Sequence, residues 1–213
     1  GNVAIYAMEK LYQLNAKPIT CSDSRGTLFH DAGIDLTLIK ELKEQQRGCL
    51  SKYKESYPEA TYIARADYPE DGHAVWRFKA DAAFPCATQN ELTQGDAKAL
   101  LSNGCILVSE GANMPSTKDA IDCFIKAKIA YGPGKAANAG GVATSQLEMA
   151  QNASMQSWTF EEVDAKLQHI MKNIFNIANE TAAEFGQPTN LLLGANIAGF
   201  RRVADAMIEQ GVV

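Results

Sequence analysis

Apolar residues recur every three or four positions at the start of the chain, the spacing of one face of a helix. The residues with this spacing are Val3, Ala7, Leu11 and Leu14. They predict a helix over residues 2–15. A short β-favouring run at residues 18–21 follows, and the polar cluster at residues 22–26 is typical of a loop. The chain is therefore expected to open with a helix and then a strand.

The middle of the chain alternates between the two periodicities. A polar-rich helix is predicted over residues 35–57, ending before Pro58, and residues 59–79 indicate a loop crossing with one short strand near 61–64. The elements predicted after it are strand 80–84, helix 93–103, strand 105–109, helix 117–128 and strand 129–131. Strands that alternate with helices of about a dozen residues indicate a parallel sheet with helices on both faces.

The last third of the chain is predicted to be helical almost throughout. The expected helices cover residues 141–155, 160–185 and 196–210. Thr159, with Glu162 three residues later, forms a capping box for the second of them, and Gly186 ends it. We expect a nucleotide-binding domain over residues 1–154 and a helical segment over 155–213. That segment either packs back on this domain and toward a further one or simply completes the core.

Composition narrows the class of protein. With 213 residues and 46% hydrophobic content, the chain is long enough to bury a core. A net charge of -5 argues against a nucleic-acid partner. No apolar run approaches about 18 residues and no secretory signal opens the chain, so we expect no membrane association and a cytoplasmic location.

Cysteine and histidine usage indicates neither a disulfide framework nor a metal site. The five cysteines are odd in number and include no CxxC pair. The only histidines, His30, His73 and His169, are distant in sequence from the cysteines of the predicted strands, which disfavours a nucleophilic thiol. We expect reduced cysteines and no metal.

The first residues fit part of a dinucleotide-binding fingerprint. That fingerprint reads G-x-G-x-x-G or G-x-G-x-x-A between a strand and a helix, and residues 1–4 (GNVA) fit its second half. An acidic residue that binds the adenosine ribose is expected about 20 residues on, where Asp23 stands. Asp23 is equally suited to capping a turn together with Ser22 and Ser24, and the two interpretations are compatible.

The charges around Asp23 leave the cofactor open. A lone acid there favours NAD, because a carboxylate repels a 2′-phosphate. The basic and hydroxyl neighbours favour NADP, since such a group can hold a phosphate. They are Ser24, Arg25, Lys43, Arg47 and Lys52. The alternative for the basic residues is a solvated helix face.

Three segments that follow predicted strands carry a resemblance to a known family. They are residues 85–91 (PCATQNE), 110–115 (EGANMP) and 133–145 (PGKAANAGGVATS). The carboxyl ends of strands are where an open α/β sheet binds ligands. Together with residues 194–207 (GANIAGFRRVADAM), these segments resemble the hexameric NADP-specific glutamate dehydrogenases over nearly the whole chain.

The resemblance implies an α/β, Rossmann-like, doubly wound and mostly parallel sheet with C-terminal helices, whose first strand is not in the sequence. It implies a cofactor site for NADP and contacts to the substrate glutamate from Val142 and Ser145. The implied cofactor residues are Gly1, Asn2, Val3, Asp23, Ser24, Lys43, Arg47, Ala87, Thr88, Gln89, Asn113 and Asn138.

The implied reaction interconverts L-glutamate with 2-oxoglutarate and ammonia in a homo-hexamer. The family's catalytic lysine and aspartate belong to an N-terminal domain that matches nothing in this sequence, so no catalytic residue is assigned. The alternatives are a non-catalytic nucleotide-binding fragment, or a related amino-acid dehydrogenase with another substrate or with NAD. We expect the 213-residue polypeptide alone to be inactive and to bind NADP weakly.

Overall fold

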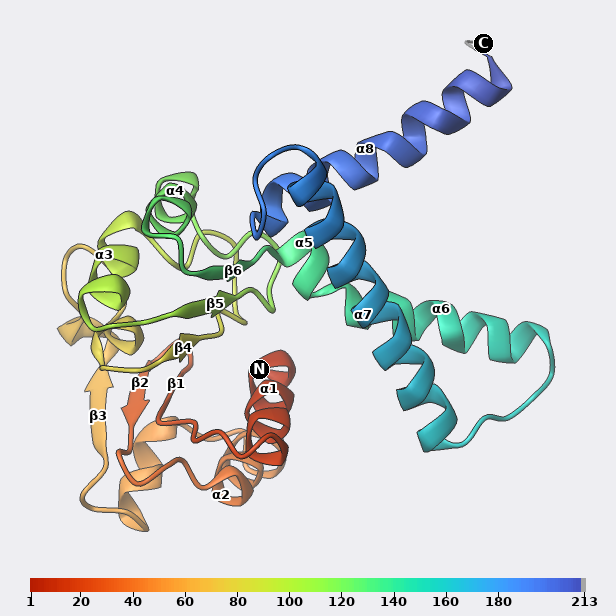
Figure 1. Ribbon diagram of the computed structural model, residues 1–213. Helices are drawn as coiled ribbons and strands as arrows, with labels where there is room; N and C mark the ends of the chain where they lie inside the picture. Colours follow the sequence, from red (N-terminus) through yellow and green to blue (C-terminus); the bar gives the residue numbers. More distant parts are fainter. Residues whose placement is uncertain (212–213) are drawn as a thin grey trace. The chain divides into compact units, whose positions relative to one another are not determined.

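The computed structural model describes residues 1–211, which divide into two compact units, Gly1–Ala130 and the residues from Tyr131 on (Figure 1). It is a mixed α/β structure. Within the described residues, no helix is both long and apolar enough to cross a membrane. The domain boundary expected at residue 154 stays a prediction.

The first unit opens with α1 (Asn2–Gln13), followed by an antiparallel sheet in the order β1-β2-β3. Its strands are β1 (Thr20–Ser22), β2 (Gly26–Phe29) and β3 (Thr61–Ala64). The prediction of a mostly parallel sheet is wrong for these strands, and β2 was not predicted. The polar residues at 22–26, expected to be a loop, form the hairpin that reverses the chain from β1 into β2.

The helix predicted over residues 35–57 is interrupted. The structure has α2 (Leu36–Lys40), the π-helix η1 (Glu41–Gln45) and the 3-10 helix η2 (Leu50–Glu55). Arg47 has a left-handed φ of 49°, which a continuous helix does not accommodate. The Gly48 N–H donates to Leu42 O at 2.7 Å and closes the turn that separates η1 from η2.

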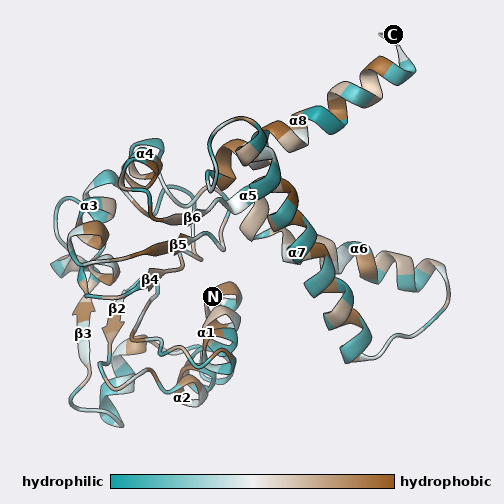
Figure 2. Cartoon of the chain, viewed as in Figure 1, coloured by the Kyte–Doolittle hydropathy of each residue, from teal (hydrophilic) through white to brown (hydrophobic). Residues whose placement is uncertain are grey.

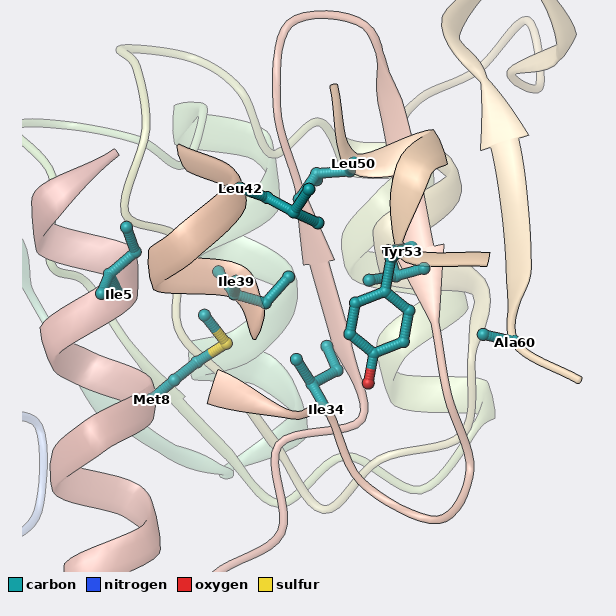
Figure 3. Close-up of a cluster of buried hydrophobic side chains, with 9 residues drawn as sticks. Ile5, Met8, Ile34, Ile39, Leu42, Leu50, Tyr53 and Ala60 are labelled. Carbon is teal, nitrogen blue, oxygen red and sulfur yellow. The ribbon is translucent and has the colours of Figure 1, made fainter. Parts of the chain in front are cut away.

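These helices enclose one side of the core of the first unit. Met8 of α1, Ile39 of α2 and Tyr53 of η2 belong to a buried cluster that also contains Leu28 of β2 (Figure 3). Ile39 is 1% exposed and Tyr53 is 0% exposed. The predicted first helix is confirmed, but the prediction of its apolar face is wrong, because Ile5 and Met8 are the buried residues whereas Val3 and Leu14 are exposed.

The second sheet confirms the predicted alternation. Its strands β4 (Ala82–Ala83), β5 (Leu107–Ser109) and β6 (Ala130–Gly132) lie in that order, and β4 and β5 are parallel. The connecting helices are α3 (Gln94–Ser102) and α4 (Lys118–Ala127). Thr93 and Thr117 cap them by accepting backbone N–H groups. Figure 2 shows β5 as strongly apolar, and Val108 at its centre is fully buried.

The second unit is helical, as predicted. It contains α5 (Gly134–Ala137), α6 (Ala139–Ala153), α7 (Phe160–Glu184) and α8 (Leu191–Gln210). The capping box of Thr159 and Glu162 is present at the start of α7, and polar and apolar residues alternate around that helix (Figure 2). Helix α8 begins five residues before the predicted position 196, because the Asn190 side chain accepts the Leu193 N–H and starts it there.

Candidate functional site

The turn between β1 and β2 is built around the Asp23 carboxylate. Its Oδ1 accepts the backbone N–H of Arg25 at 2.8 Å and that of Gly26 at 3.2 Å. Gly26 has no room for a side chain, because a Cβ there would lie 2.5 Å from the Ile63 carbonyl oxygen. The structure thus confirms that Asp23 caps this turn.

Lys43 reaches Asp23 from η1. Its Nζ donates to Asp23 Oδ2 at 2.8 Å and to the Gly48 carbonyl at 2.9 Å. Burial raises the pKa of Asp23, but the hydrogen bonds from Lys43, Arg25 and Gly26, with the charge of Lys43, outweigh it and hold that pKa below its usual range. The carboxylate and the ammonium therefore form a charged pair at neutral pH.

The other residues expected around the adenosine end are exposed. Ser24 and Arg25 lie at the tip of the turn, and Arg47 lies in the left-handed turn after η1. The structure brings Asp23 and Lys43 together, whereas it records no contact between Arg47 and Asp23. The Gly48 carbonyl was not anticipated, and no side-chain motif could have shown that a backbone oxygen would fix Lys43.

Cys49, next to Gly48, contributes a thiol with an unusual pKa. Its Sγ lies 3.4 Å from the Tyr62 hydroxyl. Burial opposes the thiolate, but hydrogen bonds from Ser51 and Tyr62 outweigh burial and lower the pKa of Cys49 to about 7. In contrast, burial raises the pKa of Cys21 to about 12 and that of Cys86 to about 11.

We expect Cys49 to react with iodoacetamide far faster at neutral pH than Cys21 or Cys86. The thiolate is the nucleophile, so its alkylation rate should rise to half of its maximum near pH 7. Peptide mass spectrometry over pH 5 to 9 measures this, and Cys49→Ser supplies the control. A rate at Cys49 that is still climbing above pH 9 would contradict the expected thiolate.

The loops after β4 and β5 meet near the start of α1. The Pro85 carbonyl accepts the N–H groups of Gly111 at 2.9 Å and Ala112 at 3.1 Å. A Cβ on Gly111 would lie 2.6 Å from Cys86 Sγ and 3.1 Å from Val3 Cγ1. Val3 and the two loops therefore lie close together at Gly111, where an added Cβ would force the Cys86 side chain to shift.

The residues expected to bind the cofactor in these loops face outward. Glu91 Oε1 accepts the Ala87 N–H at 2.9 Å and holds the loop that presents Ala87, Thr88 and Gln89, all exposed. Asn113, on the next loop, is exposed as well. The sequence did not predict that Glu91 stabilises this loop. A carboxylate four residues after Ala87 is too common a pattern to indicate a hydrogen bond to the Ala87 N–H.

The N-terminal end of α1 leaves donors available. Asn2 and Val3 lie in its first turn, and the helix has no side-chain cap. The first N–H groups of a helix lack partners within the helix and favour an anion. Gly1, Asn2 and Val3 are all exposed, so a phosphate can approach these amides.

Beside α1 runs a groove of about 600 Å³ lined by the two sheets' edges. β1 and β4 each end their sheet, and no described strand lies between them (Figure 1). The Ile19 carbonyl and the Asp23 N–H form hydrogen bonds across to the β2 side. Successive residues of a strand direct their N–H and C=O groups to opposite sides, so those of Thr20 and Ser22 face away from β2 and toward the groove. On the opposite side of the groove, the carbonyls of Asp81 and Pro85 accept hydrogen bonds from the β5 segment. The backbone N–H and C=O groups of Ala82 and Phe84 therefore face the groove.

The remaining candidate residues belong to the second unit. Asn138 joins α5 to α6, and its N–H donates to Gly134 O at 2.9 Å. Val142 and Ser145 lie three residues apart on α6, hence on one face of it, and both are exposed. That face presents an apolar and a hydroxyl group together. Within residues 1–211, no three His, Cys, Asp or Glu side chains are grouped to hold a metal ion.

Comparisons with known proteins give consistent matches. A family model described as Glutamate/Leucine/Phenylalanine/Valine dehydrogenase matches residues 1–211. The NADP-specific glutamate dehydrogenase of Helicobacter pylori is 60% identical over 212 residues, covering 100% of this chain and 47% of that protein. The NAD(P)-specific glutamate dehydrogenase of Xylanibacter ruminicola is 50% identical over 215 residues, with 100% and 47% covered.

Solved structures agree with these relatives. The crystal structure of Plasmodium falciparum glutamate dehydrogenase superposes with a TM-score of 0.92 at 46% identity, covering 100% of this chain and 45% of that one. The chain spans about half the length of the curated relatives it matches.

Proposed function

Because the chain belongs to the glutamate/leucine/phenylalanine/valine dehydrogenase family, we propose that it supplies the NADP-binding part of a glutamate dehydrogenase. The enzyme oxidises L-glutamate with NADP and water to 2-oxoglutarate, ammonia and NADPH, or runs the reverse reaction. The observation that carries the proposal is the 60% identity with an NADP-specific glutamate dehydrogenase along the whole chain. A homo-hexamer and a cytoplasmic location are proposed with it.

The site supports a dinucleotide stretched from the β1–β2 turn to the loops after β4 and β5. In this proposal the first amides of α1, at Asn2 and Val3, hold the pyrophosphate. The 2′-phosphate meets Lys43 and Ser24, with Arg47 nearby. Thr88 and its neighbours Ala87 and Gln89 line the nicotinamide end.

The remaining predicted contacts use neutral amides and one helix face. Asn113 and Asn138 bind the ribose and nicotinamide, since amide side chains hydrogen-bond without adding charge near hydride transfer. Val142 and Ser145 contact the glutamate. NADP, when bound, accepts the hydride, and the protein's contribution is to hold it against the substrate α-carbon.

Steady-state kinetics on the intact protein test this function. We expect NADP reduction that depends on glutamate, with a much lower rate for leucine, valine or phenylalanine. Faster turnover with an apolar amino acid would overturn the substrate assignment. The 50% identity with an NAD(P)-specific relative makes use of both cofactors the second candidate, and parallel assays with NAD decide it. Turnover by the 213-residue polypeptide alone would contradict the proposal that it is only the cofactor-binding part.

We propose, too, that a further strand joins the two sheets into one doubly wound Rossmann sheet. A strand residue occupies roughly 160 Å³, given a rise of about 3.3 Å, a strand spacing of about 4.8 Å and layers about 10 Å apart. The groove of about 600 Å³ therefore accommodates about four residues. Both edges that face it offer backbone donors and acceptors. Trp76 also lines it, with a buried Nε1–H that has no acceptor within residues 1–211.

Hydrogen exchange tests the added strand. In the intact protein, the amides of Thr20, Ser22, Ala82 and Phe84 should exchange on the order of 100-fold more slowly than in the 213-residue polypeptide, because the strand would occupy both edges. The amide of Leu28, in the middle strand of its sheet, is the control and should be protected in both. Equal, fast exchange at the four edge amides in both samples would rule the strand out.

A further inference from the structure

The Asp23 carboxylate has little capacity left for a ligand. Oδ1 accepts two backbone N–H groups, at 2.8 and 3.2 Å, and Oδ2 accepts the Lys43 ammonium at 2.8 Å. The side chain is only 11% exposed. Both lone pairs of Oδ1 are used, and a ribose hydroxyl could reach only the remaining lone pair of Oδ2, on a side chain that is largely buried.

Lys43, by contrast, is held in place with a donor to spare. An ammonium has three N–H groups, and the acceptors recorded for Lys43 are Asp23 Oδ2 and the Gly48 carbonyl. Its side chain is 25% exposed. A lysine normally loses much rotamer freedom when it binds a phosphate. Here two anchors have already restricted that freedom.

The pairing also resolves an electrostatic conflict. An uncompensated carboxylate next to a 2′-phosphate would repel it, whereas a carboxylate bonded to an ammonium at 2.8 Å is locally neutralised. The exposed Arg25 at the tip of the same turn then adds positive charge without a recorded acidic partner. The turn thus suits a phosphate although an acidic residue stands at its base.

We propose that Asp23 is a positioning residue, which fixes Lys43 and the turn for recognition of the 2′-phosphate of NADP and does not itself bind the ribose. This inference rests on the proposed NADP site. It reverses the usual reading of an acid at this place, under which Asp23 would favour NAD. It also makes cofactor preference depend on the pair rather than on either residue alone.

A double-mutant cycle on the intact protein tests the proposal. The variants are Asp23→Asn, Lys43→Met and the double variant, with Glu55→Gln as a control that removes an exposed carboxylate from η2. Asparagine keeps an oxygen acceptor for the turn amides but loses the charge that orients Lys43. We expect Asp23→Asn to raise the Kd and KM for NADP about tenfold, the effect of one side chain losing its pre-ordering.

The remaining expectations make the test selective. For Asp23→Asn, kcat and the Kd for NAD should change less than twofold, and in the Lys43→Met background Asp23→Asn should have no further effect. Glu55→Gln should leave every constant unchanged. A merely structural defect would impair NAD binding and kcat as well.

Three results would overturn the proposal. Equal weakening of NAD and NADP would make Asp23 a ribose ligand, and tighter NADP binding would make it a repulsive element. Additive effects of the two substitutions would show that Asp23 acts without Lys43. Calorimetry gives these Kd values without turnover. If the wild-type protein binds NADP but does not oxidise glutamate, the proposed function is wrong, whereas the proposed role of Asp23 can still be tested.

Discussion

Asp96→Ala is expected to lower the free energy of unfolding by about 3–5 kcal/mol, the cost of breaking a buried charged network. Asp96 is 0% exposed. Its Oδ1 accepts the His73 N–H at 2.8 Å and Arg77 Nη2 at 3.2 Å, and its Oδ2 accepts the N–H of Thr93 at 3.0 Å and the Thr93 hydroxyl at 2.9 Å. Alanine would leave these donors without their acceptor. The Asp96 carboxylate also joins residues 71–77 to α3, so that connection would be lost.

Asp71 provides the matched control for this prediction. It accepts the same Arg77 Nη2 at 2.9 Å, but its side chain is 65% exposed. Exposed ion pairs contribute about 1 kcal/mol or less, so Asp71→Ala should have a small effect. Urea unfolding followed by circular dichroism measures both variants. Similar losses for Asp71→Ala and Asp96→Ala would contradict the assignment of this stability to the buried carboxylate.

Gly194→Ala is expected to destabilise the packing of α8 on α7 by about 3 kcal/mol, at the upper end of overpacking costs. A Cβ at Gly194 would lie 1.8 Å from the Ala178 carbonyl oxygen and 3.1 Å from the Ala182 N. These are backbone atoms, so no rotamer change relieves the clash. The two helices must move apart, although alanine is intrinsically the better helix former.

The same helix contains its control. Gly199 would place a Cβ in open space, so Gly199→Ala should gain up to about 1 kcal/mol from helix propensity. In thermal unfolding, the midpoint should fall for Gly194→Ala and rise for Gly199→Ala, each relative to the wild type. A midpoint for Gly194→Ala at or above that of the wild type would show that the contact is not constrained as described.

The parts of the fold that the sequence predicted correctly are those specified by nearby residues. Thr93 and Thr117 mark the starts of α3 and α4 through caps that span three residues. The apolar run before each of these helices has the length of a strand and is too short to form a helix of its own. Local signals of this kind need no knowledge of the rest of the chain.

The parts that were missed depend on contacts distant in sequence. Strand β2 pairs with both β1 and β3, and the polar residues before it do not reveal that pairing. The break between η1 and η2 depends on the left-handed Arg47 and on the Gly48 carbonyl receiving Lys43, which no periodicity shows. The sequence placed Lys43 among the basic residues near Asp23, but it could not show that the two side chains form a direct ion pair.

The exposed candidate residues could be named from the sequence but not oriented by it. Thr88 and Gln89 follow a predicted strand, which suggests a binding edge. Two contacts orient these residues: the hydrogen bond from the Ala87 N–H to Glu91, and the close approach of the two loops to Val3 at Gly111. Both depend on packing at short distances. Such contacts are set by tertiary structure.

The most direct measurement is a comparison of hydrogen exchange in the intact protein with saturating NADP and with saturating NAD. Both cofactors are expected to protect the first turn of α1 and the loops at residues 85–91 and 110–115. NADP alone should add protection at residues 22–26 and 43–48, where Asp23 holds Lys43 for the 2′-phosphate. Identical protection by the two cofactors in those segments, or a difference confined to other parts of the chain, would contradict the proposed recognition of the 2′-phosphate by Lys43 and Asp23.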